Sequence, residues 1–316
     1  MFPFNREGKF FMWLILFMHA LFGAAIPISK MLLTYTTPIF FTSLRMLIAG
    51  SILSFAAYMT GITKKISRHN QSWLLLAQII FLGFYATYIL RFWGLSYIPA
   101  YKAAFFFNAS PFITALYSYI LDKERLNKMQ WLGLIIGFIG IIPILITSTP
   151  QEKSLGELFI FSWAELSVLL SVALHCYGWI LMRKICKNDN QSPVFINAIA
   201  LTAGGILALG TAATSETITY IPNFSSFFSW LIILIILNNL ISHNIYAYLL
   251  QHHYSPTFLS FTNFLSPIFS ALYGWILLNE TITWHFACST FIVFVGLYIF
   301  YREELSIKET TTANSF

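Results

Sequence analysis

The amino-acid sequence predicts an all-α polytopic membrane protein with ten transmembrane helices in two inverted five-helix repeats. Three observations predict this fold class. Of the 316 residues, 58% are hydrophobic and only 9% are charged, whereas about 25% of an ordinary soluble domain is charged. Apolar runs of about 20 residues, long enough to cross a hydrocarbon core, recur along the chain. A phrase of the first half also returns in the second half.

Polar residues between the apolar runs divide the chain into the expected spans. A bilayer offers no water to backbone N–H and C=O groups, so uncharged runs of this length form helices unless they close a β-barrel. The alternating pattern of barrel strands is absent from the sequence. We therefore expect helices near residues 10–33, 37–60, 73–95, 100–121, 129–148, 160–184, 192–214, 227–250, 256–278 and 283–302.

The repeated phrase reads ASPFITALYSYILDKE at residues 109–124 and LSPIFSALYGWILLNE at residues 265–280, at one offset of 156 residues without a gap. Each half holds five expected helices, and because five is odd, the second copy enters the membrane from the opposite side. Inverted repeats of this kind occur in secondary transporters, whose halves rock around a central site. The predicted organisation is an N-terminal segment (1–9), a first repeat (10–148), a connecting loop (149–159), a second repeat (160–302) and a C-terminal tail (303–316).

Lysine and arginine concentrate in alternate loops. Thirteen of them lie before the first span and after the second, fourth, sixth and tenth spans, against only Lys30 and Lys153 on the other side. Short loops rich in these residues stay in the cytoplasm, so we expect a multi-pass protein of a bacterial inner membrane with both termini cytoplasmic. The net charge of +6 is spread over five loops and reflects topology, so no nucleic-acid partner is expected. We expect the first span to be retained, because no convincing signal-peptidase site follows it.

The sequence lacks the usual patterns of catalytic and metal sites. Its three cysteines, Cys176, Cys186 and Cys288, are too scattered for a disulfide framework or a metal site. It contains no His-Glu-x-x-His pattern, no glycine-rich phosphate loop and no Gly-x-Ser-x-Gly nucleophile. We therefore expect no enzymatic activity, no cofactor and no metal. A membrane-embedded transferase and a channel are the alternatives to a carrier.

Several features together resemble the EamA repeats of the drug/metabolite transporter superfamily, over about residues 10–302. They are the two Ser-Pro to Glu phrases, the glycines of the fifth and tenth spans (Gly133, Gly137, Gly140 and Gly296) and the stretch YIPAYKAAFFFNASP at residues 97–111. The second copy departs further from this pattern, with HHYSPTFLSFTNFLSP at residues 252–267. The resemblance implies a carrier of small organic solutes, such as amino acids and related metabolites, driven by a proton or by a counter-substrate. We expect it to work as a monomer or a homodimer.

Charged residues divide into helix ends and helix interiors. Glu124 and Glu280 end helices at the membrane edge, where a carboxylate can bond nearby backbone, so we expect a structural role. Ionisable groups inside a span are costly and usually face a cavity or a partner. The possible coupling or gating residues are His19, Arg45, Lys102, Glu165 and His175. Structural interpretations compete: Arg45 could join helices by hydrogen bonds, Lys102 could snorkel to the interface, and the histidines could serve packing.

A second group of polar and aromatic residues is expected to bind the substrate. The eighth span reads NNLISHNIY at residues 238–246, which places three polar side chains on one face at the α-helical spacings of four and three. That face suits a lined cavity better than lipid, although an interhelical contact is the alternative. The predicted substrate-binding residues are Tyr88, Arg91, Asn108, Asn239, His243, Tyr246 and Asn263.

The mixture of rings and polar groups on these helices indicates a substrate class. Aromatic residues make up 18% of the chain, and most are expected to pack or to face lipid and interface. A pocket of aromatic rings with Arg, Asn and His suits an amphiphilic zwitterion with a flat or cationic part. S-adenosylmethionine fits this description, as does an aromatic amino acid, and a drug exporter is a further alternative. We expect Arg91 to bind the substrate carboxylate and His243 to be the candidate proton relay.

Overall fold

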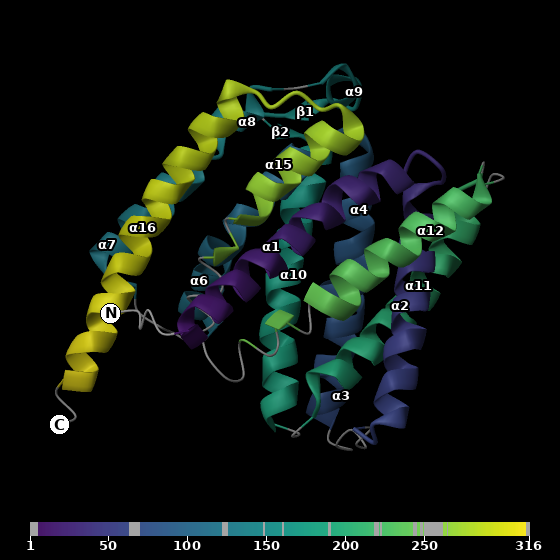
Figure 1. Ribbon diagram of the computed structural model, residues 1–316, viewed down its shortest axis with the longest axis horizontal. Helices are drawn as coiled ribbons and strands as arrows, with labels where there is room; N and C mark the ends of the chain where they lie inside the picture. Colours follow the sequence, from purple (N-terminus) through teal and green to yellow (C-terminus); the bar gives the residue numbers. More distant parts are fainter. Residues whose placement is uncertain are drawn as a thin grey trace. The chain divides into compact units, whose positions relative to one another are not determined.

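The computed structural model describes residues 6–62, 70–121, 126–147, 149–159, 161–188, 191–217, 221, 223–242, 245–246, 249, 262–263 and 265–313. This part of the chain is mostly helical, as the sequence predicts, with one small sheet of two strands, β1 (Glu157–Leu158) and β2 (Phe161–Ser162) (Figure 1). The helices are α1 (Arg6–Leu32), α2 (Pro38–Met59), α3 (Asn70–Gln78), the π-helix η1 (Ile79–Ala86), α4 (Thr87–Tyr97), α5 (Ala100–Phe106), the 3₁₀ turn η2 (Phe107–Ala109), α6 (Ser110–Leu121), α7 (Lys128–Ile139), α8 (Ile142–Leu145), α9 (Pro150–Ser154), α10 (Trp163–Asn188), α11 (Pro193–Ser215), α12 (Phe224–Leu234), the π-helix η3 (Ile235–Ser242), α15 (Leu265–Leu278) and α16 (Trp284–Ala313).

Seven helical segments in the described ranges are long and apolar enough to cross a membrane. They are Phe10–Leu32, Pro38–Met59, Ser72–Tyr97, Lys128–Leu145, Trp163–Cys186, Pro193–Ser215 and Phe224–Ser242. Two shorter apolar helices, Leu265–Leu278 and Trp284–Phe300, follow them. Each of these segments coincides with one of the predicted apolar runs, which supports a multi-pass membrane protein. The count of ten spans stays a prediction.

The expected span at residues 100–121 is interrupted rather than continuous. The 3₁₀ turn η2 separates α5 from α6. Pro111 is the second residue of α6, where its missing N–H and fixed φ suit the first helical turn but would break a helix interior. Pro111, which belongs to the repeated phrase, therefore lies in the first turn of a new helix.

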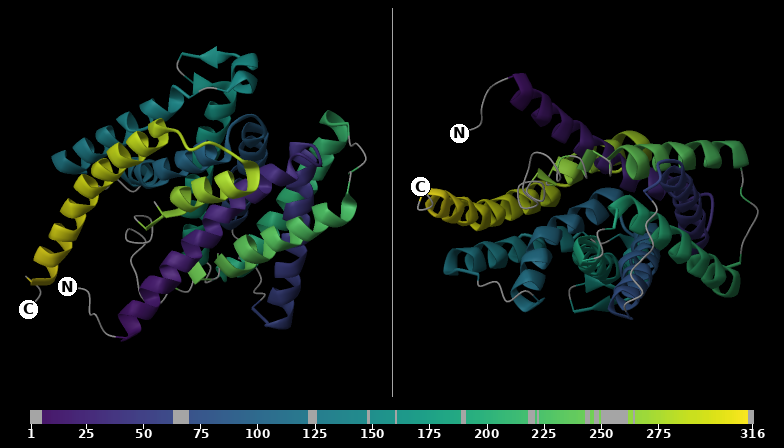
Figure 2. Two further views of the ribbon diagram at one scale, coloured as in Figure 1. Left: turned by 45° about the horizontal axis from the view of Figure 1, so that its top comes forward. Right: turned by 90° about the horizontal axis from the view of Figure 1, so that it is seen from below.

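The chain forms two compact units, and each unit draws on both halves of the sequence. Unit 1 comprises Met1–Pro27, Pro99–Phe161 and Ile241–Phe316, and unit 2 comprises Ile28–Ile98 and Ser162–Leu240. Within unit 2, α2 packs along α11, and α10 packs on α4 (Figures 1 and 2). Both α2 and α11 begin at a proline, Pro38 and Pro193, which presets the first turn. Within unit 1, α16 runs beside α7.

Two carboxylates fix the start of a helix elsewhere in their own unit. In unit 1, Glu280 accepts hydrogen bonds from the backbone N–H groups of Ala100 (2.7 Å) and Tyr101 (3.3 Å) at the start of α5. In unit 2, Glu216 accepts from the N–H groups of Ile39 (2.9 Å) and Phe40 (2.8 Å) at the start of α2. A carboxylate at a helix N-terminus satisfies free donors and complements the helix dipole. The structural role predicted for Glu280 is confirmed, while Glu124 lies outside the described residues.

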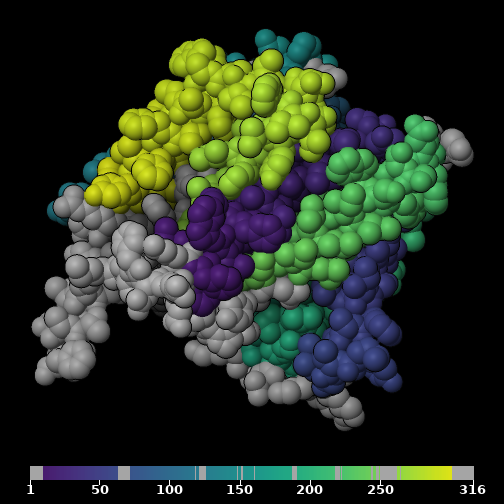
Figure 3. Space-filling view, viewed as in Figure 1, coloured from purple at the N-terminus to yellow at the C-terminus, as the bar shows by residue number. Residues whose placement is uncertain are grey.

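Large apolar side chains are exposed on the surface of α15 and on the part of α16 up to Phe300. Figure 3 shows this surface of α15 and α16 in yellow-green and yellow. The exposed side chains of these helices include Trp275 and Ile276 on α15 and Phe291, Phe294 and Tyr298 on α16, with Phe291 69% exposed. Exposed large apolar side chains suit contact with lipid.

Candidate substrate site

Arg45 carries a charge into the interior of unit 2. It lies about 10 Å along α2 from Pro38, at 1.5 Å per residue, and its side chain is only 4% exposed. Its Nη1 donates to Ser29 Oγ (3.2 Å), and its Nη2 donates to Asn238 Oδ1 (2.8 Å) and more weakly to Asn239 Oδ1 (3.5 Å). Arg45 therefore joins α2 to α1 and η3 by hydrogen bonds, while its coupling or gating role stays a prediction.

Tyr88, at the start of α4, lies between two arginines. Arg45 Cζ is 5.8 Å and Arg91 Cζ is 5.2 Å from the centre of the Tyr88 ring, and Arg45 Cζ is 5.3 Å from the ring of Phe92. The ring of Phe84 stacks parallel to Tyr88. An aromatic face within about 6 Å attracts a guanidinium electrostatically. We call Arg45, Tyr88, Arg91, Asn238 and Asn239 the arginine cluster.

The direct partners of the Arg45 guanidinium are neutral. Its partners are a hydroxyl, two side-chain amides and two aromatic rings. Among the described residues, no carboxylate lies within 4 Å of it, and its buried Nε has no hydrogen-bond acceptor. Buried charges in proteins are normally paired with an opposite charge or a ligand. The cluster can therefore accept an anionic group.

Two π-helical segments adjoin the cluster. η1 ends two residues before Tyr88, and η3 carries Asn238 and Asn239. The two segments occupy equivalent positions of the repeat, because η3 begins at Ile235 and η1 at Ile79, an offset of 156 residues. π-helical turns are rare and frequently occur at functional sites.

The π-helix bears on the polar face expected in the eighth span, whose role in substrate binding stays a prediction. The predicted face of Asn239, His243 and Tyr246 relied on α-helical spacing, which does not apply within η3 because its hydrogen bonds join residues five apart. As a result, Asn238 and Asn239 both contact Arg45. Tyr246 belongs to unit 1, where its ring meets the edge of Phe22 at 6.5 Å between centroids. His243 lies outside the described residues.

Unit 1 holds a second polar group around His19 of α1. The ring nitrogens of His19 hydrogen-bond to Ser266 Oγ (3.0 Å) and Thr262 Oγ1 (2.8 Å), and Ser266 Oγ donates to Asn263 Oδ1 (3.2 Å). His19 and Asn263, predicted separately, thus meet through Ser266. Two hydroxyl partners satisfy both ring nitrogens, so this arrangement fits a packing histidine. A coupling role for His19 stays a prediction.

Asn108, in the 3₁₀ turn η2 of unit 1, is buried. Neither polar atom of its side chain has a hydrogen-bond partner in the part of the chain that the structure describes. A buried amide without partners costs free energy, so Asn108 is well suited to meet a ligand or water. Its predicted place in a substrate site stays a prediction.

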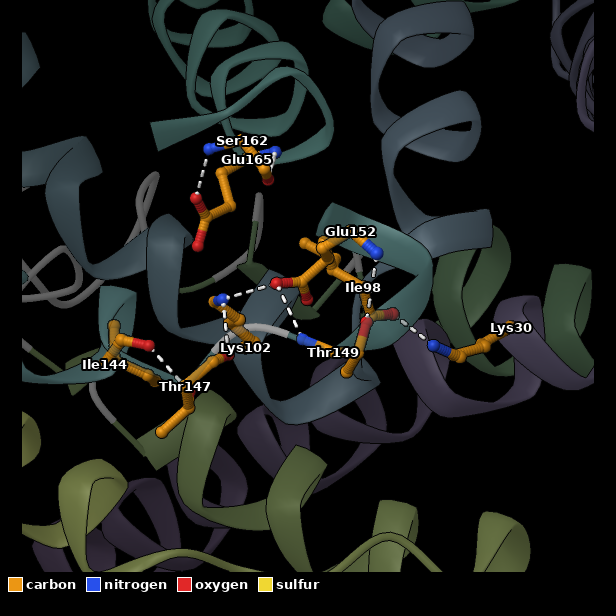
Figure 4. Close-up of polar contacts among 9 residues, drawn as sticks. All are labelled: Lys30, Ile98, Lys102, Ile144, Thr147, Thr149, Glu152, Ser162 and Glu165. Atoms are coloured by element: carbon orange, nitrogen blue, oxygen red, sulfur yellow. Dashed lines mark hydrogen bonds and ion pairs between the residues drawn. The ribbon is translucent and has the colours of Figure 1, made fainter. Parts of the chain in front are cut away.

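Lys102 differs from the expectation that it snorkels. Its side chain is 0% exposed, and its Nζ donates to Glu152 Oε2 (2.9 Å) and to the backbone oxygen of Thr147 (2.8 Å). The same Glu152 oxygen accepts from the backbone N–H of Thr149 at the start of α9 (3.2 Å), as Figure 4 shows. The buried carboxylate of Glu152, in α9, compensates the charge of the buried ammonium. The snorkelling interpretation is wrong.

The remaining candidates lie on α10 in unit 2. Glu165 is at the first turn, where its carboxylate accepts from Ser162 N (2.7 Å) and its own N–H donates to Ser162 Oγ (3.2 Å), a reciprocal capping arrangement (Figure 4). His175 Nε2 accepts from Trp179 Nε1 (2.9 Å), one turn further along the helix. Both residues therefore have local partners on α10, and their coupling roles stay predictions.

Sequence reasoning missed several partners. Asn238 is not among the predicted substrate-binding residues, although it makes the shorter bond to Arg45. Phe92 follows Tyr88 by four residues, a helical spacing that places both rings on one side of α4. Glu152 follows Thr149 by three residues, the spacing of a capping box. These local signals are present in the sequence, but they do not identify the distant partners.

Residues 9–146 and 162–302 match the EamA-like transporter family. The chain belongs to this family. An S-adenosylmethionine/S-adenosylhomocysteine transporter of Chlamydia muridarum is 30% identical to this EamA-like transporter over 294 residues, covering 92% of this chain and 91% of that protein. The protein of that name in Chlamydia trachomatis serovar L2 is 29% identical over 298 residues, covering 92% of this chain and 89% of its own. An uncharacterised transporter of Bacillus subtilis is 26% identical over 272 residues, covering 85% and 84%.

A solved crystal structure has the same fold as this EamA-like transporter. It matches with a TM-score of 0.64 and 16% sequence identity, over 91% of this chain and 96% of its own. The family and the names of the relatives are those of transporters, so this chain is a transporter and not an enzyme. The resemblance noted in the sequence is confirmed.

Proposed function

We propose that this EamA-like transporter carries S-adenosylmethionine across a bacterial inner membrane in exchange for S-adenosylhomocysteine. The observation that carries the proposal is the arginine cluster, a buried guanidinium with neutral partners beside stacked aromatic rings. The Chlamydia relatives, which are named as transporters of S-adenosylmethionine and S-adenosylhomocysteine, support the same substrate pair.

The chemistry of the cluster matches the parts of this substrate. The guanidinium of Arg45 suits the carboxylate of the amino-acid portion, because planar N–H groups pair well with two oxygens. The aromatic rings of Tyr88 and Phe84 suit the flat adenine. The sulfonium must lie away from Arg45 and Arg91, since like charges repel strongly where the dielectric constant is low. Both substrates share the carboxylate and the adenine, and they differ at the sulfur.

Transport itself is proposed to follow alternating access. Ten helices in two inverted repeats would let the two halves rock around a site near the bilayer midplane, with both termini in the cytoplasm. The offset of 156 residues between η1 and η3 supports this repeat relation. A counter-substrate or a proton would drive the cycle.

Uptake by proteoliposomes tests the proposal. Vesicles loaded with S-adenosylhomocysteine should take up labelled S-adenosylmethionine at least about tenfold faster than empty vesicles, because return of the loaded carrier completes the exchange cycle. Vesicles without protein provide the background. A pH gradient imposed on empty vesicles distinguishes proton coupling from exchange.

The same assay can reject the substrate. A rate equal to that of protein-free vesicles under both driving forces would rule out this substrate pair. Labelled tryptophan or phenylalanine taken up in its place would favour an aromatic amino-acid carrier, which the rings beside Arg45 also suit.

A further inference from the structure

We infer that Arg45, rather than the Arg91 favoured from the sequence, selects substrates by their carboxylate, and that the amide oxygen of Asn238 occupies the guanidinium until that carboxylate replaces it. This inference rests on the proposed function, because it names the residue that recognises the amino-acid part of the substrate. Its evidence is the difference between the hydrogen bonds that Nη1 of Arg45 makes and those that its Nη2 and Nε make.

One side of the guanidinium is fixed to the protein. Nη1 of Arg45 donates to Ser29 Oγ at 3.2 Å, and the rings of Tyr88 and Phe92 lie 5.8 and 5.3 Å from Cζ. A hydroxyl at one end and two rings close to the guanidinium restrict its rotation. Such preorganisation reduces the entropy that binding must cost.

The other side is only half occupied. The Nε–H and one Nη2–H of a guanidinium point in the same direction and form an edge that matches the two oxygens of a carboxylate. In Arg45, Nη2 donates to the side-chain oxygen of Asn238 at 2.8 Å and more weakly to that of Asn239 at 3.5 Å, while the buried Nε has no acceptor among the described residues. The Nε half of this edge therefore lacks an acceptor in the part of the chain that the structure describes.

A carboxylate is the ligand that completes this edge. It would supply both oxygens and a negative charge, and charge-assisted bonds are stronger than bonds to a neutral amide. The amide of Asn238 can leave without exposing a charge, whereas a resident acid would compete with the substrate. The neutral amide of Asn238 thus accepts a hydrogen bond from Nη2 in the absence of substrate, and a substrate carboxylate can replace it.

Paired ligands with and without a carboxylate test the inference. We expect wild-type exchange to prefer S-adenosylmethionine over its decarboxylated analogue by at least about tenfold, equivalent to about 1.4 kcal/mol. Arg45→Lys keeps the charge but loses the two-pronged edge, so the preference should fall below about threefold, because uptake of S-adenosylmethionine falls more than uptake of its decarboxylated analogue. Arg183→Lys, at an exposed position of α10, is the matched control and should keep the full preference. An unchanged preference in Arg45→Lys would overturn the inference.

Asn238→Asp provides a second test that keeps the side-chain size. A resident carboxylate should occupy Arg45 and slow the uptake of S-adenosylmethionine at least about fivefold more than the uptake of the decarboxylated analogue. Equal effects on both ligands, or no effect on either, would also overturn the inference. This variant serves if Arg45→Lys fails to fold, because it adds a partner to the guanidinium instead of altering it.

Failure of the proposed function gives a different result. If the wild type takes up tryptophan but not S-adenosylmethionine, the proposed substrate is wrong, and tryptophan and tryptamine become the test pair for Arg45 and Asn238. Loss of discrimination in Arg45→Lys with that pair would support the inference without the proposed function. Wild-type uptake that ignores the carboxylate in both pairs would overturn it.

Discussion

At the residue scale, Lys102 and Glu152 form a fully buried ion pair within unit 1. Removing one partner strands the other charge, at a cost of about 3–5 kcal/mol, whereas removing both is far less costly. We expect Lys102→Met to lower the Tm of the detergent-purified protein by at least about 5 °C, and Lys102→Met with Glu152→Gln to recover more than half of that loss. Lys153→Met, at the exposed neighbouring position, should leave Tm unchanged. Equal Tm values for Lys102→Met and Lys153→Met would contradict the stabilising role of the pair.

At the scale of elements, the π-helix η1 approaches α10 closely at two glycines of unit 2. A Cβ atom at Gly178 would lie 2.6 Å from Cα of Gly83, closer than real contacts allow. Gly178→Ala should therefore destabilise the protein by about 1–3 kcal/mol through overpacking. Gly210→Ala is the control, since no atom lies within 4 Å of its added Cβ, and alanine should stabilise that helix by about 0.5–1 kcal/mol. The Tm of both variants, measured by thermal unfolding, tests this prediction. A Tm for Gly178→Ala at or above that of Gly210→Ala would refute the close packing of Gly178 on Gly83.

At the scale of the whole molecule, the asymmetry of basic loops predicts the orientation in the membrane. Reporter fusions after residues 68, 125 and 187 and at the C-terminus should report the cytoplasm, because lysine and arginine retain these segments there. Fusions near residues 153 and 220 should report the opposite side. A cytoplasmic signal at residue 153 would exclude the ten-helix topology.

Much of the helical framework could be predicted because it depends on local properties. The run expected at 37–60 is the helix Pro38–Met59, and the run expected at 192–214 is the helix Pro193–Ser215. Apolar length and proline punctuation alone decide these boundaries. The 3₁₀ break at Phe107–Ala109 and the π-turns of η1 and η3 were not predicted. They depend on how one helix packs against the next, which apolar periodicity does not report.

The sequence by itself determined the membrane class, the positions of the apolar runs, the repeat offset and the small set of polar residues inside the spans. It could do so because the cost of polar groups in lipid acts on each segment separately. Only the tertiary structure decided which of these residues meet. Arg45 and Asn238 are 193 positions apart, and His19 and Ser266 are 247 positions apart. Contacts over such separations arise from the packing of whole helices. The pairing of Asn238 with Nη2 of Arg45, beside an Nε without an acceptor among the described residues, is therefore visible only in the folded chain.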